Sequence, residues 1–365
     1  MSERTFSLRA CCIAAGLVCL LGLCIEAQAQ DLDLGIEPPP SPVAWSGDWL
    51  VRGDVVRSGW GGDHLNRVWT RLRYGPTWQV NDRWILGGAL RVDESTVGND
   101  EVIQNNDNER SRDLTLDSLF LSYAPVPDDR LLVGKAAFPL ELSRMLWDRD
   151  LRPAGVSYSH NMAFGIDNNF RIVGGGFLGE QMFGDQSRIV ALQLALNLHQ
   201  TSTVSPEFIV SDLRYSNLDA LAAAGLDRGN TLLNGNFEYG FELVDVQFVL
   251  HMNTTLPMRL LFDADRNVKA GNWDQAGRIE FAVGDIFRAH GQQAGIAYER
   301  IQRDAVLGAF NDDDWWFHAG SRGVMLWYAY GVTDQARLRL AYFREREDWS
   351  SYSTRRWLLD LQWSL

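Results

Sequence analysis

The sequence predicts an all-β fold: an antiparallel β-barrel that crosses a membrane with about sixteen strands, within a range of roughly fourteen to eighteen. First, runs of about ten residues alternate apolar and polar side chains and are separated by Gly, Asn, Asp and Pro clusters. Second, no apolar stretch long enough for a membrane-spanning helix follows the first thirty residues. Third, 33 Gly, 14 Trp, 10 Tyr and 17 Phe supply turns and interfacial aromatic side chains. Strands must then form a closed barrel, because lipid cannot satisfy open backbone groups.

Residues 1–29 have the pattern of a cleaved signal peptide. Arg4 and Arg9 precede an apolar run over residues 10–25, and Ala27-Gln28-Ala29 forms a small-residue cleavage site. A lipoprotein signal ending at Cys24 is the alternative. All 4 cysteines of the chain fall within this segment. The processed chain is therefore expected to contain no disulfide, zinc site or thiol nucleophile.

Residues 30–46 are Pro-rich and follow neither a strand nor a helix period, so we expect a short periplasmic arm. Residues 47–365 form the predicted barrel. The least certain part is 234–253, which fits one long strand or a hairpin. Alternation alone also fits a soluble sandwich. Aromatic residues near the run ends, together with short connections alternating with long ones such as 98–113, favour the barrel.

Charge and motifs exclude several function classes. The chain carries 34 Lys+Arg against 47 Asp+Glu, a net charge of −13, which argues against a nucleic-acid partner. No phosphate loop, dinucleotide fingerprint or metal-ligand His spacing occurs, so we expect no cofactor and no metal. The nearest hydrolase set is Ser157, Ser159, His160 and Asn161. On a strand, Ser159 and His160 point to opposite faces, so we expect no enzyme.

Arginine recurs on the faces that would line the pore. If the apolar faces contact lipid, eight arginines line the lumen: Arg52, Arg71, Arg73, Arg83, Arg91, Arg337, Arg339 and Arg356. Barrel closure puts the last strand beside the first, so they would form one wall across about five strands. We expect this wall to face acidic groups from Asp93, Asp360 and an inward loop, giving a transverse field that selects ions. The alternative is that these arginines are merely solvated and paired.

The segment 144–153 is the candidate constriction loop, because long loops in compact frames are often functional. Its candidate residues are Trp147, Asp148, Arg149, Asp150 and Arg152. As an alternative, Asp148 and Asp150 could bind Ca²⁺ together with Asp312, Asp313 and Asp314, because clustered oxygen ligands suit that ion. A solvated acidic loop remains the favoured interpretation.

Several motifs resemble a family of bacterial outer-membrane β-barrel porins. In that family a Gly-Lys strand runs into a loop with a Trp-Asp-x-Asp-Leu-x-Pro-x-Gly stretch, as in 131–135 and 147–155 here. The segments 114–117 and 298–314 add to the resemblance, which covers most of the processed chain. Ala154 departs from it, because the family usually has Glu there. The resemblance implies an outer-membrane channel of about this strand number.

These observations predict a porin of a Gram-negative outer membrane, through which small hydrophilic solutes or ions diffuse passively. The alternatives are a structural or adhesive barrel without an open pore and, least favoured, an outer-membrane hydrolase. The expected partners are membrane lipid, lipopolysaccharide and the barrel-assembly machinery. That machinery would read the last strand, whose alternate residues are apolar up to Leu365. A homotrimer is left open as the assembly.

Overall fold

The structure is a computed structural model that describes residues 42–58, 64–98, 107, 113–179, 186–198 and 203–365. The predicted signal peptide, 1–29, and residues 30–41 of the predicted arm lie outside the described residues. The first strand begins at Val43, four residues before the predicted start of the barrel at 47. Within the described residues, no helix has the length and hydropathy needed to cross a membrane.

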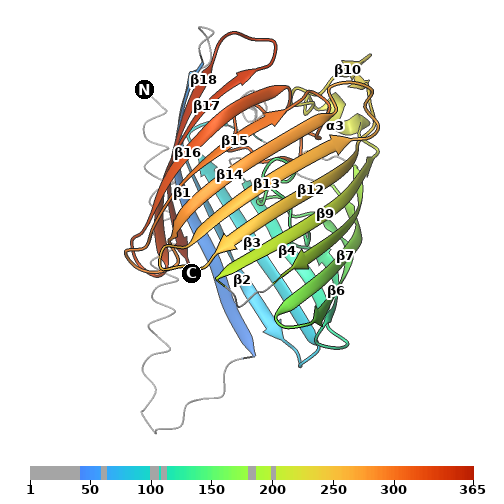
Figure 1. Ribbon diagram of the computed structural model, residues 1–365, viewed down its shortest axis with the longest axis vertical. Helices are drawn as coiled ribbons and strands as arrows, with labels where there is room; N and C mark the ends of the chain where they lie inside the picture. Colours follow the sequence, from blue (N-terminus) through green and yellow to red (C-terminus); the bar gives the residue numbers. More distant parts are fainter. Residues whose placement is uncertain (1–41, 59–63, 99–106, 108–112, 180–185, 199–202) are drawn as a thin grey trace. The chain divides into compact units, whose positions relative to one another are not determined.

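The fold is a closed antiparallel barrel of sixteen strands, which confirms the predicted class and strand number (Figure 1). The strands are β1 (Val43–Arg57), β2 (His64–Gln79), β3 (Trp84–Ser95), β4 (Asp113–Tyr123), β5 (Asp129–Lys135), β6 (Ala154–Phe164), β7 (Asn168–Leu178), β8 (Arg188–Asn197), β9 (Val204–Ser216), β12 (Glu242–Met252), β13 (Met258–Asn267), β14 (Gln275–Asp285), β15 (Gln292–Ile301), β16 (Ser321–Gly331), β17 (Ala336–Glu347) and β18 (Thr354–Ser364). The connection 217–241 holds the helix α3 (Asp219–Ala223) and a hairpin of β10 (Leu232–Leu233) and β11 (Asn236–Phe237).

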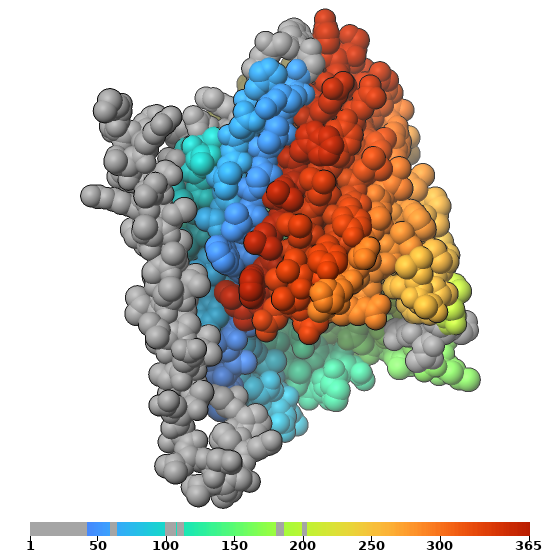
Figure 2. Space-filling model, turned by 90° about the vertical axis from the view of Figure 1, so that its left-hand side faces the viewer, coloured from blue at the N-terminus to red at the C-terminus, as the bar shows by residue number. Residues whose placement is uncertain are grey.

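The barrel closes where β1 pairs with β18. Arg52 lies opposite Asp360, and Val56 lies opposite Arg356. Figure 2 shows the first strand, in blue, beside the last, in red, along this seam. Closure leaves no unpaired strand edge, which is the condition for strands to cross a bilayer.

Burial alternates along the strands as the sequence pattern predicts. On β8, Ile189 and Ala191 are buried, whereas Val190 and Leu192 are exposed. The exposed face of β18 is likewise apolar, with Trp357, Leu359, Leu361 and Trp363. The apolar faces therefore point away from the barrel interior, and the alternate, largely polar faces point into it.

The connections differ in length between the two ends of the barrel. Short turns such as 80–83 and 165–167 lie at the end of the barrel where β1 begins and β18 ends. Longer connections lie at the other end, including 136–153, 217–241 and 302–320, and α3 and β10 are seen there at the top of Figure 1. This alternation is the expected arrangement of short periplasmic turns and long external loops.

Two long connections fold into the barrel: 136–153, here called the first inward loop, and 302–320, the second inward loop. Both contribute buried apolar residues to one cluster with inward side chains of β7, β8, β9, β12 and β15. Members include Met145, Leu146, Val306 and Phe310. At the long-loop end, the lumen therefore contains an apolar cluster beside its polar lining. The apolar side chains of the two inward loops pack there against one another and against inward side chains of the strands, because this burial removes them from water.

Candidate functional site

Seven of the eight predicted pore arginines lie on five adjacent strands, β17, β18, β1, β2 and β3. These seven form what we call the arginine wall: Arg52, Arg71, Arg73, Arg91, Arg337, Arg339 and Arg356. The prediction of Arg83 as a pore residue needs a correction, because Arg83 is exposed in the turn before β3. The Asn81 side chain accepts a hydrogen bond from the backbone N–H of Arg83 at 2.9 Å, and the Arg83 carbonyl accepts one from the backbone N–H of Ala124 at 2.8 Å, so Arg83 is held in the turn at the short-turn end of the barrel.

Acidic side chains on the same strands pair with these arginines. Asp360 accepts hydrogen bonds from Arg52 Nε at 2.6 Å and Arg52 Nη2 at 3.0 Å. Asp54 accepts two from Arg356, at 3.0 and 2.8 Å. The predicted acidic residue Asp93 lies only 2.5 Å from Arg91 Nε. Asp360, Asp54 and Asp93 therefore form ion pairs with arginines of the wall and do not face the wall from across the lumen.

The second inward loop adds Asp314 to the wall. Its carboxylate lies 2.6 Å from Arg52, 2.5 Å from Arg339 and 2.7 Å from Arg144 of the first inward loop. Burial by itself raises the pKa of Asp314, but Arg52, Arg339 and Arg144 together hold that pKa well below its ordinary value. Asp314 therefore stays ionised and fixes this loop to the wall.

The first inward loop adds Asp150 in the same way. Its carboxylate lies 2.5 Å from Arg71 and 3.0 Å from Arg73. Burial raises the pKa of Asp150, but Arg71 and Arg73 outweigh it and hold the pKa well below its ordinary value. The pairing of β3 with β4 shifts register beside Asp117. The buried Asp117 carboxylate lies 2.8 Å from Arg73 Nε and 3.7 Å from Arg152 Nε.

The two inward loops are also joined to each other. Trp147 stacks between Phe138, with ring centroids 4.2 Å apart, and Phe310, at 5.5 Å. Tyr215 of β9 stacks on the far side of Phe310, at 5.7 Å. The backbone N–H of Asp148 donates to the carbonyl oxygen of Phe310 at 2.7 Å. Among the predicted loop residues, Trp147 and Asp148 hold the two loops together and Asp150 contacts Arg71 and Arg73 of the wall. Arg152 contacts Asp117 of β4, and Arg149 is exposed.

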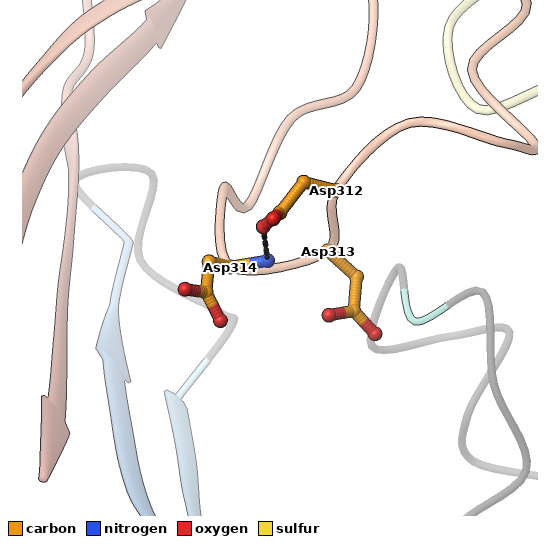
Figure 3. Close-up of side chains that lie close together, drawn as sticks. All are labelled: Asp312, Asp313 and Asp314. Atoms are coloured by element: carbon orange, nitrogen blue, oxygen red, sulfur yellow. Dashed lines mark hydrogen bonds between the residues drawn. The ribbon is translucent and has the colours of Figure 1, made fainter. Parts of the chain in front are cut away.

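Asp312, Asp313 and Asp314 each offer an oxygen within 4.8 Å of the others, and Asp312 accepts a hydrogen bond from the backbone N–H of Asp314 (Figure 3). Arginines already neutralise the group, because Arg144 lies 3.0 Å from Asp312 and 2.7 Å from Asp314. A calcium ion would have to displace these guanidinium groups from their carboxylates. The geometry therefore favours ion pairing over the calcium alternative.

A cavity of about 1290 Å³ lies between the arginine wall, the inward loops and the inner faces of β9 and β12 to β16. Arg52, Arg71 and Arg339 line it from the wall, and Arg144 and Arg149 line it from the first inward loop. Its lining extends to Phe287 and Pro257 in the short turns at the opposite end of the barrel. Four arginines of the wall, Arg52, Arg71, Arg337 and Arg339, thus line one cavity together with the candidate loop.

Several interior residues escaped prediction. Arg67 is buried on β2, lies 3.0 Å from Asp54 and also pairs with Asp107. Arg67 lies on the same face of β2 as Arg71 and Arg73, so the alternation of the sequence could have identified it. Arg278 on β14 lies 2.6 Å from both Glu280 and Glu299. No sequence pattern links Asp107, in a long connection, to its partner.

The residues of the hydrolase alternative do not assemble a catalytic site. His160 Nδ1 lies 2.6 Å from Asp129, which also accepts a hydrogen bond from the Tyr158 hydroxyl at 2.8 Å. Within the described part of the chain, no serine hydroxyl is hydrogen-bonded to His160. A serine nucleophile would need that contact to lose its proton.

The fold resembles solved outer-membrane porin structures. The high-pH structure of OprB from Pseudomonas putida matches with a TM-score of 0.61 and 12% identity, over 88% of this chain and 94% of that one. OmpF of Salmonella typhi in complex with daunomycin matches with a TM-score of 0.52 and 13% identity, over 88% and 97%. A loop L8 deletion mutant of OmpT, an outer membrane protein of Vibrio cholerae, matches with a TM-score of 0.52 and 10% identity, over 88% and 99%. At these identities the likeness shows the fold alone. No family model and no curated protein matches the sequence.

Proposed function

We propose that this chain is an outer-membrane porin through which small hydrophilic solutes or ions diffuse passively along the arginine wall. One observation carries the proposal: a closed barrel of sixteen strands encloses a cavity of about 1290 Å³ lined by charged side chains. Barrels of this size can hold an aqueous channel. The motif resemblance to a porin family and the fold of the structural neighbours support the same function.

We place the barrel in the outer membrane of a Gram-negative bacterium. The outward faces of the strands are apolar, and Trp357 and Trp363 on β18 supply aromatic groups of the kind found at membrane interfaces. Lipid and lipopolysaccharide would then surround the barrel, and β18 would be the strand read by the barrel-assembly machinery. Cell fractionation tests the location. The mass of the detergent-solubilised protein tests whether it is a homotrimer.

Conductance of the purified protein in planar lipid bilayers tests the channel. We expect discrete current steps in potassium chloride. We also expect a reversal potential that changes when charges of the wall are removed. A folded barrel that inserts into the bilayer without producing current steps would contradict the proposal.

A structural or adhesive barrel without an open pore is the second candidate. The observation that favours it is the apolar cluster made by the inward loops, because this cluster occupies the long-loop half of the lumen. The same recordings separate the two functions. Only a porin conducts without first displacing those loops.

A further inference from the structure

On the basis of the proposed channel, we propose that its cavity selects small organic anions with an apolar body, and that aromatic carboxylates are the chemical class it fits best. Either of two arginines that have no carboxylate partner among the described residues would bind the carboxylate, and an apolar side of the cavity would contact the ring.

The first observation is that some arginines of the cavity lie beside a carboxylate and others do not. Eight arginines line it. Six of these lie within 4.0 Å of a carboxylate: Arg52, Arg71, Arg144, Arg259, Arg278 and Arg339. Among the described residues, neither Arg149 nor Arg337 has a carboxylate within that distance or a side-chain hydrogen bond. Both guanidinium groups can therefore bind an incoming anion without breaking an existing ion pair.

Arg149 lies in the first inward loop, and its side chain is exposed within the cavity. Partial loss of surrounding water in the cavity lowers the pKa of Arg149, the positive charge of Arg144 lowers it further, and the negative charge of Asp312 opposes both. A carboxylate at this position would offset that repulsion. It could also accept two parallel hydrogen bonds from the planar guanidinium.

Arg337 lies at the other end of the cavity, on β17 next to the short turns. Its guanidinium carbon is 4.8 Å from the ring centroid of Phe287, and its Nε is buried without a hydrogen-bond partner. Stacking uses the face of the guanidinium and leaves the N–H groups at its edge free to donate. Arg337 therefore offers a second position for an anionic group.

The second observation is an apolar side of the lumen, where polar side chains are the usual lining. Val249 and Leu261 lie opposite each other on β12 and β13, and both line the cavity. Met325 and Trp327 continue this side on β16. The Trp327 ring packs so closely on Gly295 that a Cβ there would lie 2.0 Å from it. Trp327 is thereby held as a flat aromatic surface.

An aromatic carboxylate combines the two features, because its ring can stack on Trp327 and its charge can bind an arginine. The cavity volume of about 1290 Å³ leaves room for such a solute with water around it. Chloride and acetate lack the ring. A neutral sugar would leave both unpaired guanidinium groups without a counter-charge.

The test uses the purified full-length processed protein in planar bilayers. Conductance in potassium chloride is recorded first. Zero-current potentials are then measured under equal gradients of sodium chloride, sodium acetate and sodium benzoate. We expect benzoate to permeate better than its mobility in water predicts, and to reduce the chloride current at millimolar concentration. Benzyl alcohol, which has the ring without the charge, should not reduce that current.

Three variants and a matched control assign the effect. Loss of a charge-assisted hydrogen bond corresponds to about tenfold in affinity, so R149S and R337S should each weaken the benzoate block about tenfold. W327A should weaken the benzoate block without changing acetate permeation, and W327F should restore it. Arg344 is also on β17 but belongs to the exposed face, so R344S should leave all three anions unchanged.

The outcomes separate the two proposals. A protein that gives no current in potassium chloride overturns the channel, and the anion selectivity with it. If the protein conducts chloride, and benzoate and acetate permeate only in proportion to their mobilities in water, the proposed channel function stands. The proposed selectivity for aromatic carboxylates is then overturned. Equal effects of W327A on benzoate and acetate would also overturn the role of the apolar side.

Discussion

The Asp314 carboxylate contacts Arg52 at 2.6 Å and thereby joins the second inward loop to the first strand of the barrel. The same carboxylate contacts Arg339 of β17 at 2.5 Å. One loop residue thus spans three adjacent strands of the arginine wall, because β18 lies between β17 and β1. The position of this loop in the lumen depends on electrostatics as well as on apolar packing.

The D314N variant should detach this loop. Removing one partner from a buried ion pair costs about 3 to 5 kcal/mol, because Arg52 and Arg339 then lose a counter-charge. We expect a lower free energy of unfolding in urea, followed by tryptophan fluorescence, and noisier single-channel currents. D212N is the matched control, because Asp212 pairs with Arg214 on the outer face of β9. Equal stability of D314N and D212N would contradict a fixing role for Asp314.

Trp147→Ala should loosen the contact between the two inward loops. The substitution removes a ring that stacks on both Phe138 and Phe310, and large-to-small changes of this kind cost about 3 to 5 kcal/mol. We expect larger single-channel conductance, because the first inward loop would leave the lumen more often. The exposed Trp78 of β2 provides the control W78A. Unchanged conductance in W147A would show that the first loop does not limit the current.

Arg71→Ser combined with Arg73→Ser should shift the reversal potential toward cation selectivity. Both arginines contact Asp150, and Arg73 also contacts Asp117, so their removal leaves Asp150 without these two partners and Asp117 with Arg152 at 3.7 Å. Selectivity is measured as the zero-current potential under a potassium chloride gradient. R83S is the comparison, because Arg83 is exposed in the turn before β3 and does not line the cavity, so it should cause no shift.

Acidification should make the channel more selective for anions. Burial raises the pKa of Glu141, and Glu207 raises it further, while Arg171 opposes both. Glu141 therefore takes up its proton above the ordinary glutamate pKa of about 4.3, and the lumen loses a negative charge as the pH falls through that region. E141Q should show at pH 7 part of the change that the unaltered protein shows on acidification. His251 Nε2 lies 3.9 Å from the Glu207 carboxylate, so H251Q is measured separately as a control.

Calcium should not stabilise the barrel through Asp312, Asp313 and Asp314. Arg144 contacts two of these carboxylates, and Arg52 and Arg339 contact Asp314. Thermal unfolding in detergent should therefore be the same with calcium and with a chelator. A higher unfolding temperature in calcium that disappears in D312N would restore the cation site.

Local alternation predicted most of the barrel, because each strand needs one face for lipid and one for the lumen. It placed Arg52, Arg71 and Arg73 on the inner face without knowledge of the fold. The segment 234–253 resolves into the short β11 followed by β12, a division that the alternation could not make. Arg83 was assigned to the lining because the alternation continues into the turn, where the side chain is exposed and does not line the cavity.

The interior of the barrel was less predictable. The prediction of 144–153 as a lumen loop came from length and composition, which do not reveal what the loop contacts. The pairing of Asp314 with Arg52 joins residues 262 positions apart. The stacking of Trp147 on Phe310 likewise joins two loops that are distant in the sequence. Such contacts depend on the closed barrel, so no local pattern contains them.

The pairing of Arg52 with Asp360 has a consequence for how the barrel closes during assembly. The last strand can join the first in more than one register, and a slip by one residue exchanges the inner and outer faces of a strand. Such a slip would move the Asp360 carboxylate into hydrocarbon, away from its guanidinium, at a cost of several kcal/mol. This ion pair therefore discriminates against misaligned closure, and it can do so only once Asp360 has been synthesised.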